Sequence, residues 1–143
     1  MSDLEKVRQW LLSWEGMTRM DGLRVDFYAP QPENGSLAPA GLTEIARYSD
    51  ILGRVTVENQ YAFALYFQME WVEGETTRNN ADWLLSLQKW IQTQCLAGLA
   101  PRFGENQRIR AMGGALESVS EEGTAVYCVK LAIQFVTRFM PED

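Results

Sequence analysis

The clearest pattern in the sequence is a strict alternation of hydrophobic and other residues from Tyr61 to Trp71. Successive side chains of a β-strand point to opposite faces, so this alternation predicts a long strand that buries one face. A second alternation spans residues 124–139 and predicts another long strand. Its inward phase consists of Ala125, Tyr127, Val129, Leu131, Ile133 and Phe135.

Shorter strands are predicted at residues 23–28, 42–48 and 54–58, the last two flanking a turn at Ser49 and Asp50. Residues 108–119 form the first arm of a final hairpin. Gly113 and Gly114 interrupt that arm and predict a β-bulge, and residues 120–123 form its turn. Residues 30–41 hold three Pro and two Gly, a composition that predicts a loop.

Two amphipathic helices are predicted. Ser2 and Glu5 form a capping-box pattern at the start of a helix over residues 3–15. Asn79 or Asn80 is the predicted N-cap of a second helix that ends at Gly98. Its buried stripe is Trp83, Leu84, Leu87, Trp90 and Ile91.

The order of these elements predicts the fold class. Two helices and a set of hairpins, without an internal repeat or a linker, are typical of α+β proteins. We expect residues 1–143 to form a single soluble domain, an antiparallel β-sheet with the two amphipathic helices packed against it.

Composition excludes several kinds of chemistry. The 143 residues contain no histidine, which removes catalytic triads that depend on it and the commonest transition-metal ligand. A net charge of −6 argues against direct binding of nucleic acid. Cys95 and Cys128 lack metal-ligand spacing and predict reduced, buried thiols. The sequence shows no targeting signal and no membrane-spanning run, so we expect cytoplasmic synthesis.

Candidate catalytic groups are few. Glu70, Glu73 and Glu75 form the densest carboxylate cluster, but their spacing matches no calcium-binding loop. Tyr61, Phe63 and Phe67 share the phase of hydrophobic strand residues, which favours core packing over a base-stacking platform. The sequence therefore predicts no catalytic residue, no metal and no cofactor.

Surfaces for assembly are better supported. The outer phase of the last strand contains Val126, Cys128 and Ala132, which are too apolar for a fully solvated face. Either a helix of the same chain or another subunit must cover it. The predicted loop at 30–41 and the turn at 48–54 are further candidates for contact with a partner.

A family resemblance rests on stretches that follow one another in a fixed order. They are Leu23 to Tyr28, then Val55-x-x-x-Asn59-Gln60-Tyr61-Ala62-Phe63, then Trp83…Leu87-Gln88-Lys89-Trp90-Ile91-x-x-Gln94 closing in Gly98-Leu99-Ala100-Pro101, then Ile109…Gly113-Gly114-Ala115-Leu116 and Gly123-x-Ala125-x-Tyr127. Through them the chain resembles the minor capsid or tail-completion proteins of long-tailed bacteriophages, which are related to tail terminators. The family's Tyr-x-Asp-Gly signal is matched only loosely, by Tyr48-Ser49-Asp50-Ile51-Leu52-Gly53.

The resemblance implies a structural protein of the virion, at the head–tail joint or in the tail, and not an enzyme. Proteins of this family cap the tail tube as a hexameric ring and present a surface to the head connector. The expected partners are therefore other copies of the chain, the tail-tube protein and head-connector proteins. The candidate interface residues are Asn34, Leu37, Tyr48, Asp50, Ile51, Leu52, Arg54, Val126 and Lys130.

Two other functions stay open on the sequence. The first is a non-catalytic binding module, such as an adaptor or immunity-type protein, that forms no ring. The second is a hydrolase that uses Glu70, Glu73 and Glu75.

Overall fold

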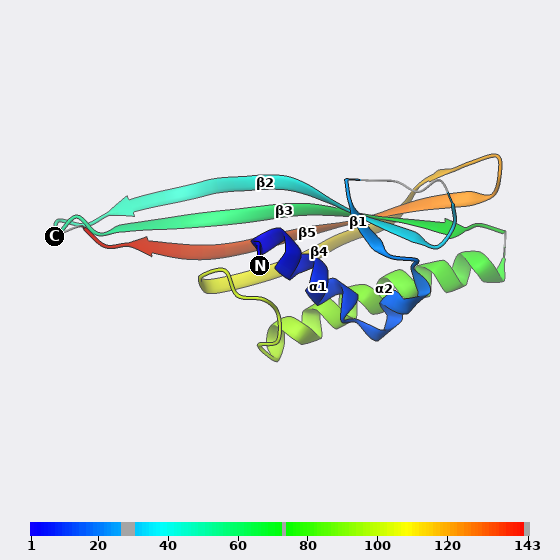
Figure 1. Ribbon diagram of the computed structural model, residues 1–143, viewed down its shortest axis with the longest axis horizontal. Coiled ribbons are helices and arrows are strands. Elements are labelled where there is room, and N and C mark those ends of the chain that lie inside the picture. Colours follow the sequence, from blue (N-terminus) through cyan, green and yellow to red (C-terminus); the bar gives the residue numbers. More distant parts are fainter. Residues whose placement is uncertain (27–30, 73, 142–143) are drawn as a thin grey trace.

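The computed structural model describes residues 1–26, 31–72 and 74–141. These residues form an α+β fold in which both α-helices lie against one β-sheet (Figure 1). In chain order the elements are α1 (Asp3–Leu12), the 3-10 helix η1 (Glu15–Arg19), β1 (Leu23–Val25), β2 (Asn34–Ser49), β3 (Val55–Glu70), α2 (Glu75–Leu96), β4 (Glu105–Val119) and β5 (Thr124–Phe139).

The described strands form one sheet in the order β1-β2-β3-β5-β4. The pairs β2–β3, β3–β5 and β5–β4 are antiparallel, whereas the short β1 runs parallel to β2. The prediction of a purely antiparallel sheet is therefore wrong at β1. A hydrophobic pattern specifies which face a strand buries, but it does not specify the direction of its neighbour.

Both α-helices lie on the same face of the sheet, and they cover only part of its length (Figure 1). The part that carries the β2–β3 turn and the end of β5 projects beyond them (Figure 1). No helix in the described part of the chain covers the opposite face, so the alternative in which a helix of the same chain covers the outer phase of the last strand is wrong (Figure 1).

The core lies between the helices and the inward phases of β3 and β5. Its central side chains are no more than 1% exposed, and they include Leu65, Phe67, Met69, Val129, Leu131 and Ile133. Burying each such side chain stabilises the fold by roughly 1.5–3 kcal/mol. The predicted inward phases of both long strands are confirmed.

Helix α2 contributes the predicted buried stripe. Leu84, Leu87 and Ile91 are buried, while Trp83 and Trp90 pack against the core from its margin. Trp90 stacks on Trp10 of α1 with 5.3 Å between ring centroids, which joins the two helices.

The helix ends are only partly as predicted. The Ser2 Oγ accepts a hydrogen bond from the Glu5 backbone N–H at 3.2 Å, so the predicted N-cap of α1 is confirmed. The α-helix ends at Leu12 rather than at residue 15. Helix α2 begins at Glu75, which makes Asn79 and Asn80 interior residues and corrects the predicted cap. Gly98 follows its C-terminal end in the left-handed conformation with φ 71°, as predicted for a helix stop.

The largest correction concerns residues 34–41, which belong to strand β2 and not to a loop. Asn34 to Pro39 pair in register with Gln68 to Phe63 of β3. The Gly and Pro residues are accommodated within the strand, because a bulge between Pro39 and Leu42 holds Gly41 at φ 90°. The strand segments predicted at 54–58 and 61–71 are likewise one continuous strand, β3.

The final hairpin agrees with its prediction. Strand β5 spans Thr124–Phe139, and the pairing of β4 with β5 shifts between Gly113 and Ala115, where the bulge was expected. Strand β1 includes only Leu23 to Val25. Phe27 and Tyr28 at the end of that predicted strand, Pro30 of the predicted loop and Glu73 lie outside the described residues.

Candidate assembly surfaces

We define the projecting arm as residues 42–58 together with residues 136–141. Ile51 at its turn is fully exposed, and Tyr48 and Leu52 are 58% and 64% exposed. More than half of each of the Leu42, Phe139 and Met140 surfaces is also exposed. Clustered exposed hydrophobic residues of this kind mark interaction surfaces.

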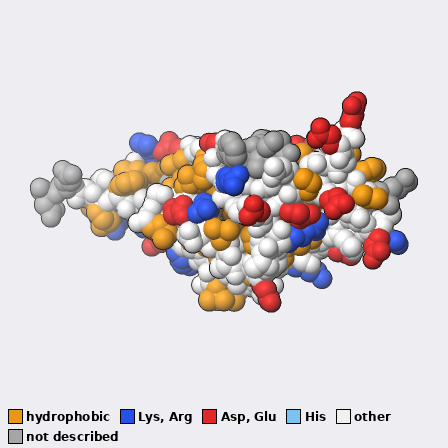
Figure 2. Space-filling model, turned by 45° about the vertical axis from the view of Figure 1, so that its right-hand side comes forward, with side chains coloured by type: hydrophobic (Ala, Val, Ile, Leu, Met, Phe, Trp, Pro, Cys, Tyr) orange, Lys and Arg blue, Asp and Glu red, His pale blue; other side chains and the backbone are white. Residues whose placement is uncertain are grey.

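The charge is distributed unevenly over the visible face of the molecule. On the face shown in Figure 2, acidic side chains are most numerous toward one end, where basic side chains lie among them, and hydrophobic side chains occur toward both ends.

The turn at the tip of the arm is held by side-chain hydrogen bonds. Asp50 Oδ1 accepts from the backbone N–H groups of Leu52 at 2.9 Å and Arg54 at 3.0 Å. Arg54 Nε donates to Asp50 Oδ2 at 2.6 Å. Desolvation would raise the pKa of Asp50, but these hydrogen bonds outweigh it and lower the pKa. The tip therefore presents Ile51 and Leu52 on an ordered turn.

A groove of about 620 Å³ lies on the helix-bearing side of the arm. Its hydrophobic lining includes Val57, Phe135 and Phe139. The rings of Tyr61 and Phe103, which also line it, meet edge to face with 5.4 Å between their centroids. The arm thus offers apolar surface at its tip and along this side.

The sheet face opposite the helices carries small side chains on its two central strands, among larger ones such as Gln60 and Lys130. On this face Ala62 pairs with Ala132, and Tyr66 pairs with Cys128. Cys128 and Ala132 are buried although no described helix covers them. Tyr66 of β3 and Glu117 of β4 lie close enough to the Cys128 thiol to influence its pKa, so neighbouring strands supply part of that burial.

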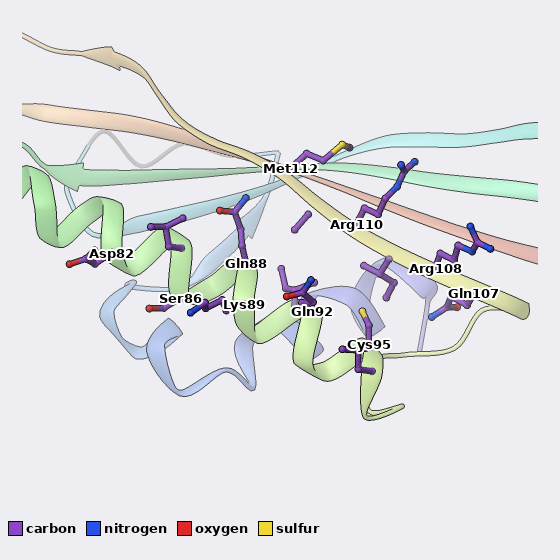
Figure 3. A pocket seen from close by; sticks show the side chains of 15 residues that line it. Asp82, Ser86, Gln88, Lys89, Gln92, Cys95, Gln107, Arg108, Arg110 and Met112 are labelled. Atoms are coloured by element: carbon purple, nitrogen blue, oxygen red, sulfur yellow. The ribbon is translucent and has the colours of Figure 1, made fainter.

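A larger groove, of about 970 Å³, separates α2 from the edge strand β4 (Figure 3). Ile91, Ile109 and Ala111 supply apolar lining, and Leu85 and Met112 are exposed beside it. The residues labelled around it in Figure 3 include Asp82, Gln88, Lys89, Gln92, Cys95, Arg108 and Arg110. We call this the α2–β4 groove.

The predicted interface residues fall into three separate places. Five of them lie together at the tip of the arm, namely Tyr48, Asp50, Ile51, Leu52 and Arg54.

Val126 and Lys130 lie on the sheet face opposite the helices, which we call the open sheet face. Lys130 is exposed there and Val126 is half-buried. Asn34 and Leu37 lie in β2 instead of a loop. Leu37 is completely buried, and Asn34 is 7% exposed with its side-chain amide donating to the carbonyl of Gln31 at 3.0 Å. These two residues are inaccessible to a partner in this conformation, which corrects their predicted role.

Several surface residues were missed by the sequence prediction. Leu42, Phe139 and Met140 belong to the arm, and Arg108 and Arg110 belong to the α2–β4 groove. The alternation in residues 108–112 could have indicated a two-faced strand, but only the topology shows that this strand lies at an edge.

Two kinds of reactive group can be described, namely metal ligands and thiols. Among the described residues no three His, Cys, Asp or Glu side chains are grouped closely enough to hold a metal ion. Burial raises the pKa of both Cys95 and Cys128, and Glu117 raises that of Cys128 further. Both thiols therefore stay protonated at neutral pH and are weak nucleophiles.

Comparison with known proteins gives no family assignment. No protein-family model matches the sequence, and no curated protein matches it significantly. None of the helices in residues 1–26, 31–72 and 74–141 is long and apolar enough to cross a membrane.

Proposed function

We propose that this chain is a non-catalytic structural subunit that self-associates into a ring at the head–tail joint of a long-tailed bacteriophage or prophage and caps the tail tube. The observation that carries this proposal is the projecting arm. Its tip presents Tyr48, Ile51 and Leu52 to solvent on a turn ordered by Asp50 and Arg54. Hydrophobic side chains displayed this way are stabilised when a second protein surface covers them.

The shape of the fold is suited to ring formation. The arm projects from one end, while the helices and the α2–β4 groove occupy the remainder (Figure 1). Contact between two different surfaces of identical subunits is heterologous, and it closes into a ring when the rotation per subunit permits. The open sheet face, with Val126 and Lys130, is a second surface available for these contacts.

The family resemblance supplies the place of action. It rests on the strand that contains Gln60-Tyr61-Ala62-Phe63, on the second helix and on the final hairpin. On this proposal the protein belongs to the virion, contacts the tail-tube and head-connector proteins, and needs no cofactor. A net charge of −6 suits a ring through which DNA passes without adhering, because like charges disfavour phosphate binding.

The arm can be tested by removing its hydrophobic character. The double substitution Ile51→Asp and Leu52→Asp places charges where a neighbouring subunit must exclude water. We expect light scattering to show assemblies for the native chain and dissociated subunits for this variant. Leu99→Asp is the matched control, since Leu99 is 66% exposed but lies outside the arm, and it should leave the assembly intact.

Two results would count against the ring. If the double variant assembles with the same dependence on protein concentration as the native chain, the arm is not an interface. A native chain that stays monomeric, ignores tail-tube protein and binds one other defined protein would instead favour the adaptor or immunity-type function.

A further inference from the structure

The two edges of the sheet differ in how well they can accept another strand. On the β2 side, Pro39 and two register shifts interrupt the edge beyond the short strand β1. Proline and bulges on an edge strand hinder the pairing of a further chain. On the other side, Arg108 to Gly113 of β4 pair with β5 residue by residue, between register shifts at either end. This six-residue segment, which we call the regular β4 segment, has no described strand on its outer side.

The α2–β4 groove runs beside the regular β4 segment. Ile109 and Ala111 pair with Ile133 and Leu131, which belong to the inward phase of β5, and both line the groove. Arg108 and Arg110 belong to the opposite phase, since they pair with Gln134 and Ala132. In Figure 3 both arginines extend from β4 away from α2.

These arginines carry charge without an ionic partner. The ion pairs of the described residues engage Lys6, Arg8, Arg19, Arg47, Arg54 and Arg138. Arg108, Arg110 and Lys89 take part in none of them, although the chain carries an excess of six negative charges. Cations on an edge strand oppose pairing with the same edge of a second copy, and they favour an acidic strand.

We propose that the α2–β4 groove binds an extended segment of a partner protein, in which acidic and hydrophobic residues alternate, as an added strand on the regular β4 segment. Side chains directly opposite each other on paired strands share a face. The acidic residues of the segment therefore lie beside Arg108 and Arg110, and its hydrophobic residues lie over Ile109, Ala111 and the adjoining surface of α2. Backbone hydrogen bonds to β4 provide the rest of the binding. This site is separate from the arm and does not depend on ring formation.

The probe is a synthetic peptide of about eight residues in which Glu and Val alternate, a length that matches the regular segment with one residue to spare at each end. Fluorescence anisotropy with the full native chain should show saturable binding of one peptide per chain. A peptide with the same composition but its Glu and Val residues in two separate blocks should bind at least about tenfold more weakly, because its charged and apolar residues no longer occupy opposite faces.

Backbone methylation distinguishes an added strand from simple attraction of charges. Only alternate N–H groups of an added strand point toward β4. Methylating that set of nitrogens should abolish binding, whereas methylating the other set should preserve it. Equal binding of both methylated peptides would overturn the proposal, since it would show electrostatic adhesion without strand pairing.

The protein side is tested with the double substitution Arg108→Gln and Arg110→Gln. We expect affinity for the alternating peptide to fall by about tenfold. Each exposed pair of opposite charges contributes at most about a factor of five, and this variant removes two such pairs. The double substitution Lys6→Gln and Arg78→Gln removes equal charge at exposed positions outside both the groove and the arm, and it should leave affinity unchanged. Equal losses in both variants would contradict a local site.

A second copy of the chain is the competing occupant. If the native chain assembles only when Arg108 and Arg110 are present, and the peptide releases its subunits, the groove is an interface between copies. That result would overturn the assignment of a separate partner. Absence of any peptide binding by the native chain would also overturn it, and that second result would not bear on the arm.

Discussion

Asn80 is completely buried at a point where four elements meet. Its side-chain amide donates to the Glu70 carbonyl of β3 at 2.9 Å and lies 3.5 Å from the Tyr127 hydroxyl of β5. Its Oδ1 accepts from Arg19 of η1 at 2.6 Å. At the scale of single residues, such polar contacts orient the helices on the sheet, because a shift of the helix would separate each donor from its acceptor.

Asn80→Ala leaves the Glu70 carbonyl and the Arg19 guanidinium without this partner. We expect it to lower the free energy of unfolding by about 1–3 kcal/mol, the cost of unsatisfied buried polar groups. Urea unfolding measures the change. Asn79→Ala is the control, because Asn79 is exposed on the same helix and its replacement should change stability by less than about 0.5 kcal/mol. Equal effects of the two substitutions would contradict the buried network.

Tyr61 makes the stability of the fold depend on pH in the alkaline range. Its hydroxyl donates to Asp3 of α1 at 2.5 Å, and this hydrogen bond, followed by burial, raises the pKa of Tyr61 from 10 to about 12. The folded state therefore holds this proton more tightly than the unfolded state. The resulting stabilisation is fully present below pH 10 and is lost as the pH rises through about 12.

The urea midpoint of the native chain should accordingly fall between pH 10 and about pH 12 more steeply than that of Tyr61→Phe. The phenylalanine variant lacks the titrating hydroxyl, so the difference between the two curves isolates this contact. Parallel curves over that range would show that the bond between Tyr61 and Asp3 contributes nothing to folding.

At the scale of elements, strand β2 shows how composition can conceal a strand. Residues 34–41 contain Gly and Pro, which favour loops in isolation. In the fold, Gly35 allows close approach, because a Cβ at that position would lie 3.0 Å from the Leu23 side chain. Pairing with the central strand β3 therefore outweighs the local preference of these residues.

The position of Leu37 in β2 can be tested by comparing two leucines of the same strand. Leu37→Ala removes a fully buried side chain and should cost about 2–5 kcal/mol. Leu42→Ala, at a position that is 55% exposed, should cost less than about 0.5 kcal/mol when measured at concentrations that keep the chain dissociated. A small effect at both positions would mean that residues 34–37 are not part of the core.

Local patterns predicted much of the fold. The alternation in residues 124–139 gave β5 its bounds and its buried face, since a period of two follows directly from strand geometry. The two glycines at 113 and 114 gave the bulge. The start of α2 was missed, because Asn80 resembles a cap in sequence but is held by Glu70 and Arg19, which are brought to it only by the folded chain.

The candidate surfaces were less predictable. The turn at 48–54 was expected. Its projection beyond the helices depends on which face of the sheet the helices cover and on how far along the strands they extend (Figure 1). The α2–β4 groove depends on β4 being the last strand of the sheet, a result of the strand order. Neither property is encoded in a short stretch of sequence.

At the scale of the whole molecule, the fold divides into a part stabilised by its own core and an arm with exposed hydrophobic residues. The helices pack over one part of the sheet, while Tyr48, Ile51 and Leu52 remain exposed at the far end. This division explains how a chain with a complete core retains surface for other proteins. It also separates the two proposals, since one assigns self-association to the arm and the other assigns binding of a partner's strand to the α2–β4 groove.

The central claim is that the chain forms a closed ring through its arm. Native mass spectrometry of the purified chain measures this most directly, because it counts subunits of 16.3 kDa in each particle. The ring predicts one dominant species of six subunits that persists on dilution and is lost in the Ile51→Asp and Leu52→Asp variant. A monomer at every concentration, or an open series of oligomers without a preferred size, would contradict it.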